Sequence, residues 1–376
     1  MLKLFSLRRV WWPWCMLLLL GGCIDPYLPE GVGAAPNYLV VDGYLNSRGR
    51  SLIQLSRTYR LDQNTAPPRE TGATLFIEQQ DGPRFPLSET APGTYTSQAL
   101  TLSPSQNYRL FISTQKGQQY ASEFVPAKVT PPIDSVAWRK TTTGLTIGVN
   151  THDDTGRSQY YRWECEETWE ITPLLFPQLE YFNSGLRPNT VVYPRICWGN
   201  ELVADIKLSK TTNLTQDRIS NYVLRSYATT NERFYNRYSI LVKQYALSQE
   251  EYQYWELLQK NTENIGTLFD PLPSQLTGNV RSLTDEAEPV IGYVGCHSLQ
   301  QQRIFITRNQ LPYTWRVSSG YDQCIPDTIE SRYIRTVFSY PENIPLYYVP
   351  GGVLGTSKEC IDCRRKGSAV KPDFWP

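Results

Sequence analysis

Short segments in which hydrophobic and polar residues alternate run through the first third of the chain. In the segment 74–78, Leu75 and Ile77 share one face, and Asp81-Gly82 follows as a hairpin-type turn. A period of two residues is that of a β-strand with one buried side. Strands are also expected at 38–43, 52–55, 108–112 and 120–125. We therefore predict that residues 38–126 form a β-sandwich of immunoglobulin-like size.

The alternation is clearest at 160–171, in the second part of the chain. Trp163 and Cys165 fall on one face of this predicted strand, and Arg162 and Glu164 fall on the other. The first face is expected in a core. The second face is expected to be solvated or to face a ligand.

Prolines divide the chain into modules. Pro126 and Pro131-Pro132 predict a linker, after which a second β-sandwich is expected over 133–376. Four prolines between 173 and 194 argue against long helices, so 172–234 is interpreted as an insertion. The predicted fold is mainly β, with two consecutive sandwiches of the immunoglobulin or fibronectin kind, one helix and a disulfide-pinned, loop-rich C-terminal extension.

One helix is predicted, at 248–264. Ser248 and Glu251 have the spacing of a capping box, and Asn264 is a stop signal. Tyr252, Trp255 and Leu258 recur at helical spacing, so Trp255 is expected to pack into the core.

The N-terminus has the layout of a secretory signal. Three basic residues precede an apolar run, and Leu20-Gly21-Gly22-Cys23 resembles a bacterial lipobox. Because the run is too short to span a bilayer, we expect a signal peptide at 1–22, a diacylglyceryl anchor on Cys23 and a tether over 23–37. Removal of residues 1–22 changes the formal charge of the chain from +1 to −2, with 34 basic and 36 acidic residues left. A charge so close to zero argues against nucleic acid as a partner.

Six cysteines remain once Cys15 leaves with the signal and Cys23 carries lipid. An even set in an oxidising compartment predicts disulfides. Proximity in the sequence favours Cys165 with Cys197. We expect Cys360 and Cys363 each to pair with Cys296 or Cys324, which would pin the C-terminal tail. The alternative is a zinc site made by Cys296, His297, Cys360 and Cys363.

Candidate catalytic groups are few. Glu164, Glu166, Glu167 and Glu170 could be imagined as a glycosidase pair, but neighbours along one strand are more simply a solvated or interface surface. His152 lies in a polar segment that is typical of a turn, and the common catalytic and nucleotide-binding motifs are absent from the sequence. We assign no catalytic residue, cofactor or metal, and expect a protein that is not an enzyme.

Aromatic side chains in turn-rich segments are the better candidates for ligand contact, although partial burial is the simpler alternative for each. These candidate contact aromatics are Trp198, Trp315, Tyr313, Tyr321, Tyr347 and Tyr348.

Several local signatures stand in one order behind the lipobox, among them Leu39-Val40-Val41-Asp42-Gly43, Pro131-Pro132-Ile133-Asp134-Ser135-Val136, Tyr252-Gln253-Tyr254-Trp255 and Cys360-Ile361-Asp362-Cys363. Together they resemble a Bacteroidota lipoprotein family known as domain of unknown function 4249. The resemblance implies an outer-membrane lipoprotein, at the cell surface rather than the periplasmic face, that partners a TonB-dependent transporter in ligand capture or uptake. The alternatives are a surface hydrolase of glycans or peptides, and an adhesin or structural envelope lipoprotein.

Overall fold

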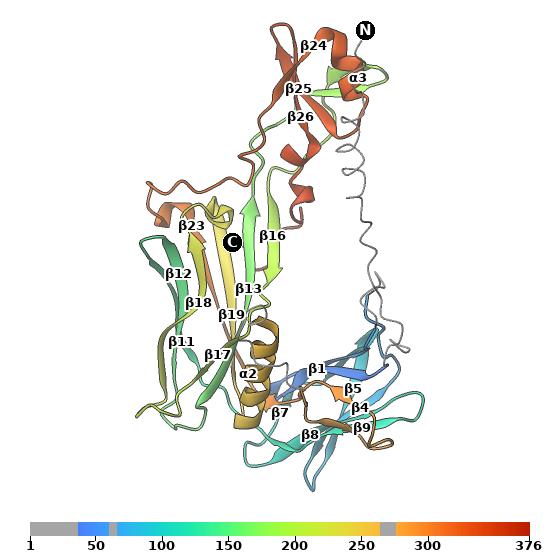
Figure 1. The fold of residues 1–376 in the computed structure, drawn as a ribbon, viewed down its shortest axis with the longest axis vertical. Helices are drawn as coiled ribbons and strands as arrows, with labels where there is room; N and C mark the ends of the chain where they lie inside the picture. The colour runs from blue at the N-terminus through green and yellow to red at the C-terminus, as the bar shows by residue number, and fades with distance from the viewer. Residues whose placement is uncertain (1–36, 60–65, 264–275) are drawn as a thin grey trace, which may run out of the picture.

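A computed structural model of the protein describes residues 37–59, 66–263 and 276–376. The described chain is mainly β, as predicted. It is elongated, with a curved N-terminal sheet at one end, a middle unit, and a small distal unit at the other end (Figure 1). The predicted signal peptide, Cys23 and nearly all of the tether lie outside the described residues.

The first unit is one large sheet that curves into a nearly closed barrel. The alternating side chains behave as predicted, because Leu75, Ile77 and Leu110 are fully buried in its core. In spatial order its strands are β20 (Val280–Ser282), β9 (Gln119–Ser122), β8 (Asn107–Ser113), β4 (Thr74–Gln79), β5 (Arg84–Ala91), β6 (Thr94–Ser97), β3 (Leu52–Arg57), β1 (Leu39–Asn46) and β21 (Val290–Ile291). Two short strands also join this sheet, β10 (Val125–Pro126) beside β8 and β22 (Cys296–His297) beside β1. A separate two-stranded sheet is formed by β2 (Arg48–Gly49) and β7 (Leu100–Thr101).

Strands from far along the chain complete this barrel. β20 pairs with β9, and β21 and β22 pair in parallel with β1. Gly292 has φ +125° and its Cα comes so close to the Val41 carbonyl that a side chain would collide there, which explains the glycine. The predicted two-layer sandwich of 38–126 is therefore wrong, because its strands form one nearly closed barrel that also includes short strands from beyond residue 279.

The middle unit has two sheets that pack on one shared apolar core. Val149, Trp163 and Ile240 lie in that core, so the predicted core face of the strand at 160–171 is confirmed. One sheet has the order β11 (Ile133–Lys140), β12 (Gly144–His152) and β18 (Arg218–Ala228). The other has the order β16 (Cys197–Leu202), β13 (Tyr160–Ile171), β19 (Arg237–Ala246) and β23 (Leu299–Thr307), and β17 (Lys207–Lys210) also pairs with β13.

Much of the predicted insertion belongs to these sheets. β16, β17 and β18 all lie within 172–234 and pair with core strands. The four prolines fall before β16, so they interrupt regular structure only over the first part of the segment. The excursion from the middle unit is thus limited to residues 172–196.

The distal unit combines that excursion with the C-terminal part of the chain, which lies beside it in Figure 1. Leu179, Phe338 and Val353 form its small core. Its elements are the hairpin β14 (Leu179–Phe182) and β15 (Gly185–Pro188), the helix α3 (Ile334–Phe338), and the sheet β24 (Asp327–Glu330), β26 (Gly352–Ser357) and β25 (Asn343–Val349).

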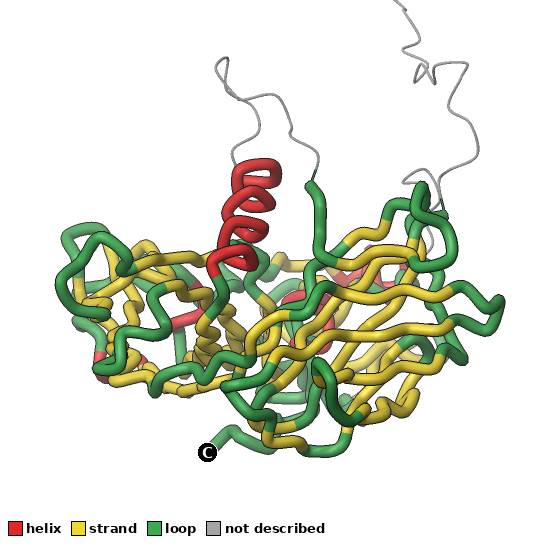
Figure 2. Tube along the Cα trace, turned by 90° about the horizontal axis from the view of Figure 1, so that it is seen from below, coloured by secondary structure: helices red, strands yellow, loops and turns green. Residues whose placement is uncertain are grey.

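The predicted helix is α2 (Gln249–Glu263), which projects from the body of the molecule in Figure 2. The Ser248 hydroxyl accepts a hydrogen bond from the Glu251 backbone N–H, as a helix cap does. The Glu251 side chain does not return to Ser248 but reaches the barrel, so only half of the capping box forms. The predicted stop at Asn264 lies outside the described residues.

Candidate functional site

A cleft of about 390 Å³ lies where the barrel, the middle unit and the start of α2 meet. Strand β1 supplies one wall, β13 and β19 supply another, and α2 and the segment 202–206 border it. The residues of the cleft that carry the argument below are aromatic or charged: Asp42, Tyr44, Arg162, Glu164, Asp205, Tyr245, Glu251, Tyr254, Trp255, Tyr293 and His297.

Arg162 lies in the wall that β13 supplies. It lies on the face of β13 that was predicted to be solvated or ligand-facing, and this face lines the cleft. Its guanidinium carbon is 3.9 Å from the centre of the Trp255 ring and 4.9 Å from that of Tyr245, and Nη2 is 2.7 Å from Oε1 of Glu164. Stacking and the ion pair together fix the orientation of the guanidinium.

The aromatic rings form a connected set around this arginine. The Tyr44 ring stacks on His297 with centres 4.5 Å apart and meets the Tyr245 ring edge-on. The Tyr254 and Tyr293 rings lie 5.3 Å apart on the helix side. Burial, with the nearby charge of Glu164, raises the pKa of Tyr44 to about 12, so its hydroxyl stays protonated at neutral pH.

The carboxylates of the cleft mostly have partners. Glu164 also accepts a hydrogen bond from the Tyr245 hydroxyl at 2.8 Å. Asp205 lies 3.0 Å from Nη1 of Arg225 and 3.5 Å from Nζ of Lys207. Asp42 is exposed at the rim, and no side-chain hydrogen bond joins it to another described residue.

The candidate contact aromatics do not come together, and none of them lines this cleft. Tyr321 is buried, and Trp315 packs against the middle core. Trp198 is half-buried and its backbone pairs with Ser368. Tyr313 is exposed, and so are Tyr347 and Tyr348 on β25 of the distal unit, where their role as contact residues stays a prediction.

Sequence reasoning missed Trp255 as a cleft residue because helical spacing placed it with Tyr252 on a core stripe. Tyr252 is buried, whereas Trp255 is half-buried and lines the cleft together with Tyr254. Trp255 also packs against the small core that contains Tyr252, so the predicted stripe is confirmed in part. The ring of Tyr254 lies off that stripe and lines the cleft as well, and this second aromatic residue was the signal for an aromatic surface beside the core.

The four glutamates on β13 lie in different environments. Glu167 is fully buried and is held by Arg225, Arg233 and Tyr227, so its predicted place on a solvated surface is wrong. Its odd number places it on the core face with Cys165. Glu166 pairs with Lys243, and Glu170 accepts a hydrogen bond from the Trp375 indole at 2.8 Å.

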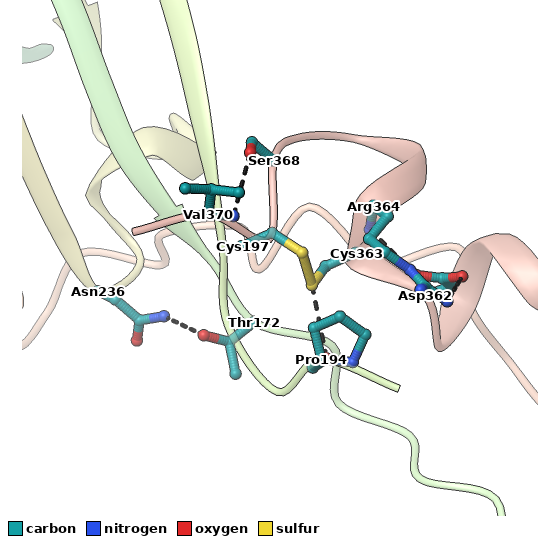
Figure 3. The surroundings of a disulfide bond; sticks show 9 residues. All are labelled: Thr172, Pro194, Cys197, Asn236, Asp362, Cys363, Arg364, Ser368 and Val370. Carbon is teal, nitrogen blue, oxygen red and sulfur yellow. Dashed lines mark hydrogen bonds and ion pairs between the residues drawn. A yellow bond between two sulfur atoms is a disulfide. The ribbon is translucent and has the colours of Figure 1, made fainter. Parts of the chain in front are cut away.

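The disulfides differ from the preferred pairing. Cys324 pairs with Cys360, one of the predicted choices, but Cys363 pairs with Cys197, and Cys165 and Cys296 are free and buried. The predicted Cys165–Cys197 bond is wrong. Cys165 faces the middle core, whereas Cys197 on β16 lies opposite Ile171, at the end of β13. Figure 3 shows the Cys197–Cys363 bond holding the C-terminal segment against β16.

The zinc alternative is also excluded by this pairing, since Cys360 and Cys363 are both oxidised. His297 instead lies 3.2 Å from Glu251. His152 ends β12 and lies 2.7 Å from Asp134, and this hydrogen bond raises the pKa of its imidazole. Within the described ranges, no group of three or more His, Cys, Asp or Glu side chains is arranged to hold a metal ion.

Comparisons with known proteins give one family. The profile described as "Domain of unknown function (DUF4249)" matches residues 24–303. No curated protein matches. A solved structure titled as manganese lipoxygenase of Gaeumannomyces graminis with partial zonadhesin of Komagataella pastoris is 10% identical, covers 58% of this chain and 91% of its own, and has a TM-score of 0.15, too low to support an argument. Among the described helices, none combines the length and apolar character needed to cross a bilayer.

Proposed function

The chain belongs to the DUF4249 family, and on that premise we propose that it is a lipid-anchored outer-membrane protein that captures a ligand for a TonB-dependent transporter. The anchor is Cys23, and the ligand site is the cleft between the barrel and the middle unit. The cell surface is the face on which such capture is useful, so we place the protein there.

The cleft is the observation that carries this proposal. Small-molecule sites are concave, largely apolar and aromatic, and carry a few fixed polar groups. Here Trp255, Tyr245 and Tyr44 supply the rings, and Arg162 and Glu164 supply polar groups held by stacking and hydrogen bonds. Binding is favoured over hydrolysis because Glu164 is engaged by Arg162 and Tyr245, as a charge partner rather than a free acid or base.

The membrane part of the proposal rests on Leu20-Gly21-Gly22-Cys23. A diacylated cysteine with a further acyl chain holds a protein to a membrane far more firmly than a single chain does. We also propose that the middle unit is a sandwich of the immunoglobulin or fibronectin kind, since its two sheets share one apolar core.

The test is affinity purification of the tagged full-length protein from membranes in a mild detergent, followed by mass spectrometry of the proteins that come with it. We expect a large outer-membrane β-barrel transporter in near-equal amount, and palmitate labelling that Cys23→Ser abolishes. The Cys15→Ser variant is the matched control, because that thiol leaves with the predicted signal peptide. Recovery of the acylated protein alone, under conditions in which known transporter complexes survive, would contradict the partnership.

A further inference from the structure

We infer that the cleft binds a neutral carbohydrate, which stacks on the aromatic rings of the α2 side and is hydrogen-bonded by Arg162, Glu164 and Asp42. This inference rests on the proposed function, because it names the ligand class of the same cleft. Three properties of the cleft carry it: its rings, its unused hydrogen-bonding groups, and its balance of charge.

The rings suit the flat faces of sugars. The C–H bonds on one face of a pyranose carry partial positive charge, and the face of an aromatic ring carries partial negative charge. Tyr254, Trp255 and Tyr293 are half-buried and line the cleft, so parts of their rings are open to a ligand. Arg162 covers one side of Trp255 and keeps that ring in place.

The polar groups suit neighbouring hydroxyls. A sugar hydroxyl both donates and accepts, so a pair of them fits a carboxylate beside a guanidinium. Arg162 uses only Nη2 in its ion pair with Glu164, so Nη1, which is not closed off as the buried Nε is, has no hydrogen-bond partner among the described residues. Each oxygen of Glu164 takes one bond and has a lone pair left, and Asp42 is exposed at the rim.

The charge of the cleft favours a neutral ligand. Glu164 is paired with Arg162, and Asp205 with Arg225 and Lys207, while Glu251 is buried and hydrogen-bonded to His297. The carboxylate of Asp42 is therefore left without a cation among the described residues. The Asp42 carboxylate would repel an anion. A cation would be attracted only to this one exposed carboxylate, and water screens that attraction.

The cleft is also held in one shape. The segment that joins the barrel to the middle unit is hydrogen-bonded on both sides: Ser47 donates to the Lys128 carbonyl at 2.7 Å, and the Ala246 N–H donates to the Thr130 hydroxyl at 3.0 Å. Gln244 donates to the Pro131 carbonyl at 2.9 Å. A site formed in advance loses little conformational freedom on binding, which suits the weak contacts that a sugar makes.

Isothermal titration of the acylated full-length protein tests the inference, in lauryldimethylamine oxide because that detergent has no sugar headgroup. The probes are neutral hexasaccharides of the gluco, galacto, manno and xylo series, with hexagalacturonate and hexalysine as charged comparators. We expect at least one neutral probe to bind with a Kd below about 1 mM, and neither charged probe to do so. Failure of all neutral probes at about 10 mM, or binding of a charged probe in their place, overturns the inference.

Variants locate the binding. Trp255→Ala is expected to weaken it by about tenfold or more, and Tyr348→Ala, an exposed ring in the distal unit, is the matched control with no effect. Asp42→Asn at the exposed rim keeps the fold even if Trp255→Ala does not, and is expected to weaken binding several-fold. Unchanged binding in Asp42→Asn and in a folded Trp255→Ala would overturn the inference. Because no transporter is present, failure here is separate from failure to recover a transporter from membranes.

Discussion

The carboxylate of Glu251, at the start of α2, lies 3.2 Å from Nε2 of His297 on barrel strand β22, and both side chains are buried. Tyr44 stacks on the His297 ring. Gly295 leaves room for the carboxylate, because a Cβ at that position would collide with it. This pair joins the helix to the barrel at the cleft.

Removal of Glu251 should therefore loosen the helix from the barrel. We expect Glu251→Ala to lower the free energy of unfolding by about 1–3 kcal/mol, because His297 is left buried with neither ring nitrogen bonded. Urea unfolding followed by tryptophan fluorescence measures the change. Glu250→Ala, at the exposed neighbouring position, is the control. Equal losses in the two variants would show that the pair does not join these elements.

Adjacent glutamates on β13 offer a second matched comparison. Glu167→Ala should cost about 3–5 kcal/mol, because Arg225 and Arg233 would both lose their fully buried carboxylate and keep only the more exposed Asp205 and Glu201. Glu166→Ala removes only a partly exposed pair with Lys243 and should cost less than about 1 kcal/mol. Urea unfolding of both variants gives the comparison, and similar midpoints for the two would contradict the buried position of Glu167.

The two disulfides should differ in their effect on stability. The Cys197–Cys363 bond links residues 166 positions apart, and the Cys324–Cys360 bond links residues 36 apart. On the chain-entropy argument, their replacement by serine pairs costs up to about 5 and about 4 kcal/mol respectively. Limited proteolysis adds a local measure: only loss of the first bond should expose residues 363–376 to early cleavage. Early cleavage there in the Cys324→Ser/Cys360→Ser variant instead would contradict the assignment.

The free thiols should resist alkylation in the folded protein. Burial, with the charge of Glu167, raises the pKa of Cys165 to about 12, and burial also raises the pKa of Cys296. A raised pKa means less thiolate at pH 8, and the thiolate is the reacting form. Iodoacetamide should modify neither thiol in native protein and both in urea, where the pKa returns to about 8.5. Mass spectrometry identifies the modified sites, and fast native labelling of either thiol would refute the prediction.

Local patterns predicted local structure well. The faces of Leu75 and Ile77, and the opposite faces of Trp163 and Arg162, follow from a period of two residues that backbone geometry imposes. The same period predicted that Arg162 and Glu164 share the face that lines the cleft. The same period also indicates that Glu167 is buried, because it lies two residues after Cys165 and so shares its face. The charge of Glu167 led to the opposite expectation.

Long-range pairing could not be predicted. β20 and β21 are three and two residues long, too short for any period to appear. Nearness in sequence favoured Cys197 with Cys165, whereas the fold brings Cys363 to Cys197 from 166 positions away. Trp255 lines the cleft where the start of α2 is joined to the barrel. The spacing of residues along one helix does not show how that helix contacts another unit.

The strands that complete the barrel impose an order of events on a newly made chain. β9 is finished at Ser122, but its partner β20 begins at Val280, so everything from β11 to α2 is synthesised between them. A chain that emerges with its N-terminus first must keep the edges of β1 and β9 unpaired over that interval. Open strand edges invite pairing with other chains. Assembly of the first unit therefore waits for residues 280–297, and a chain truncated before residue 280 should aggregate instead of yielding a separate N-terminal domain.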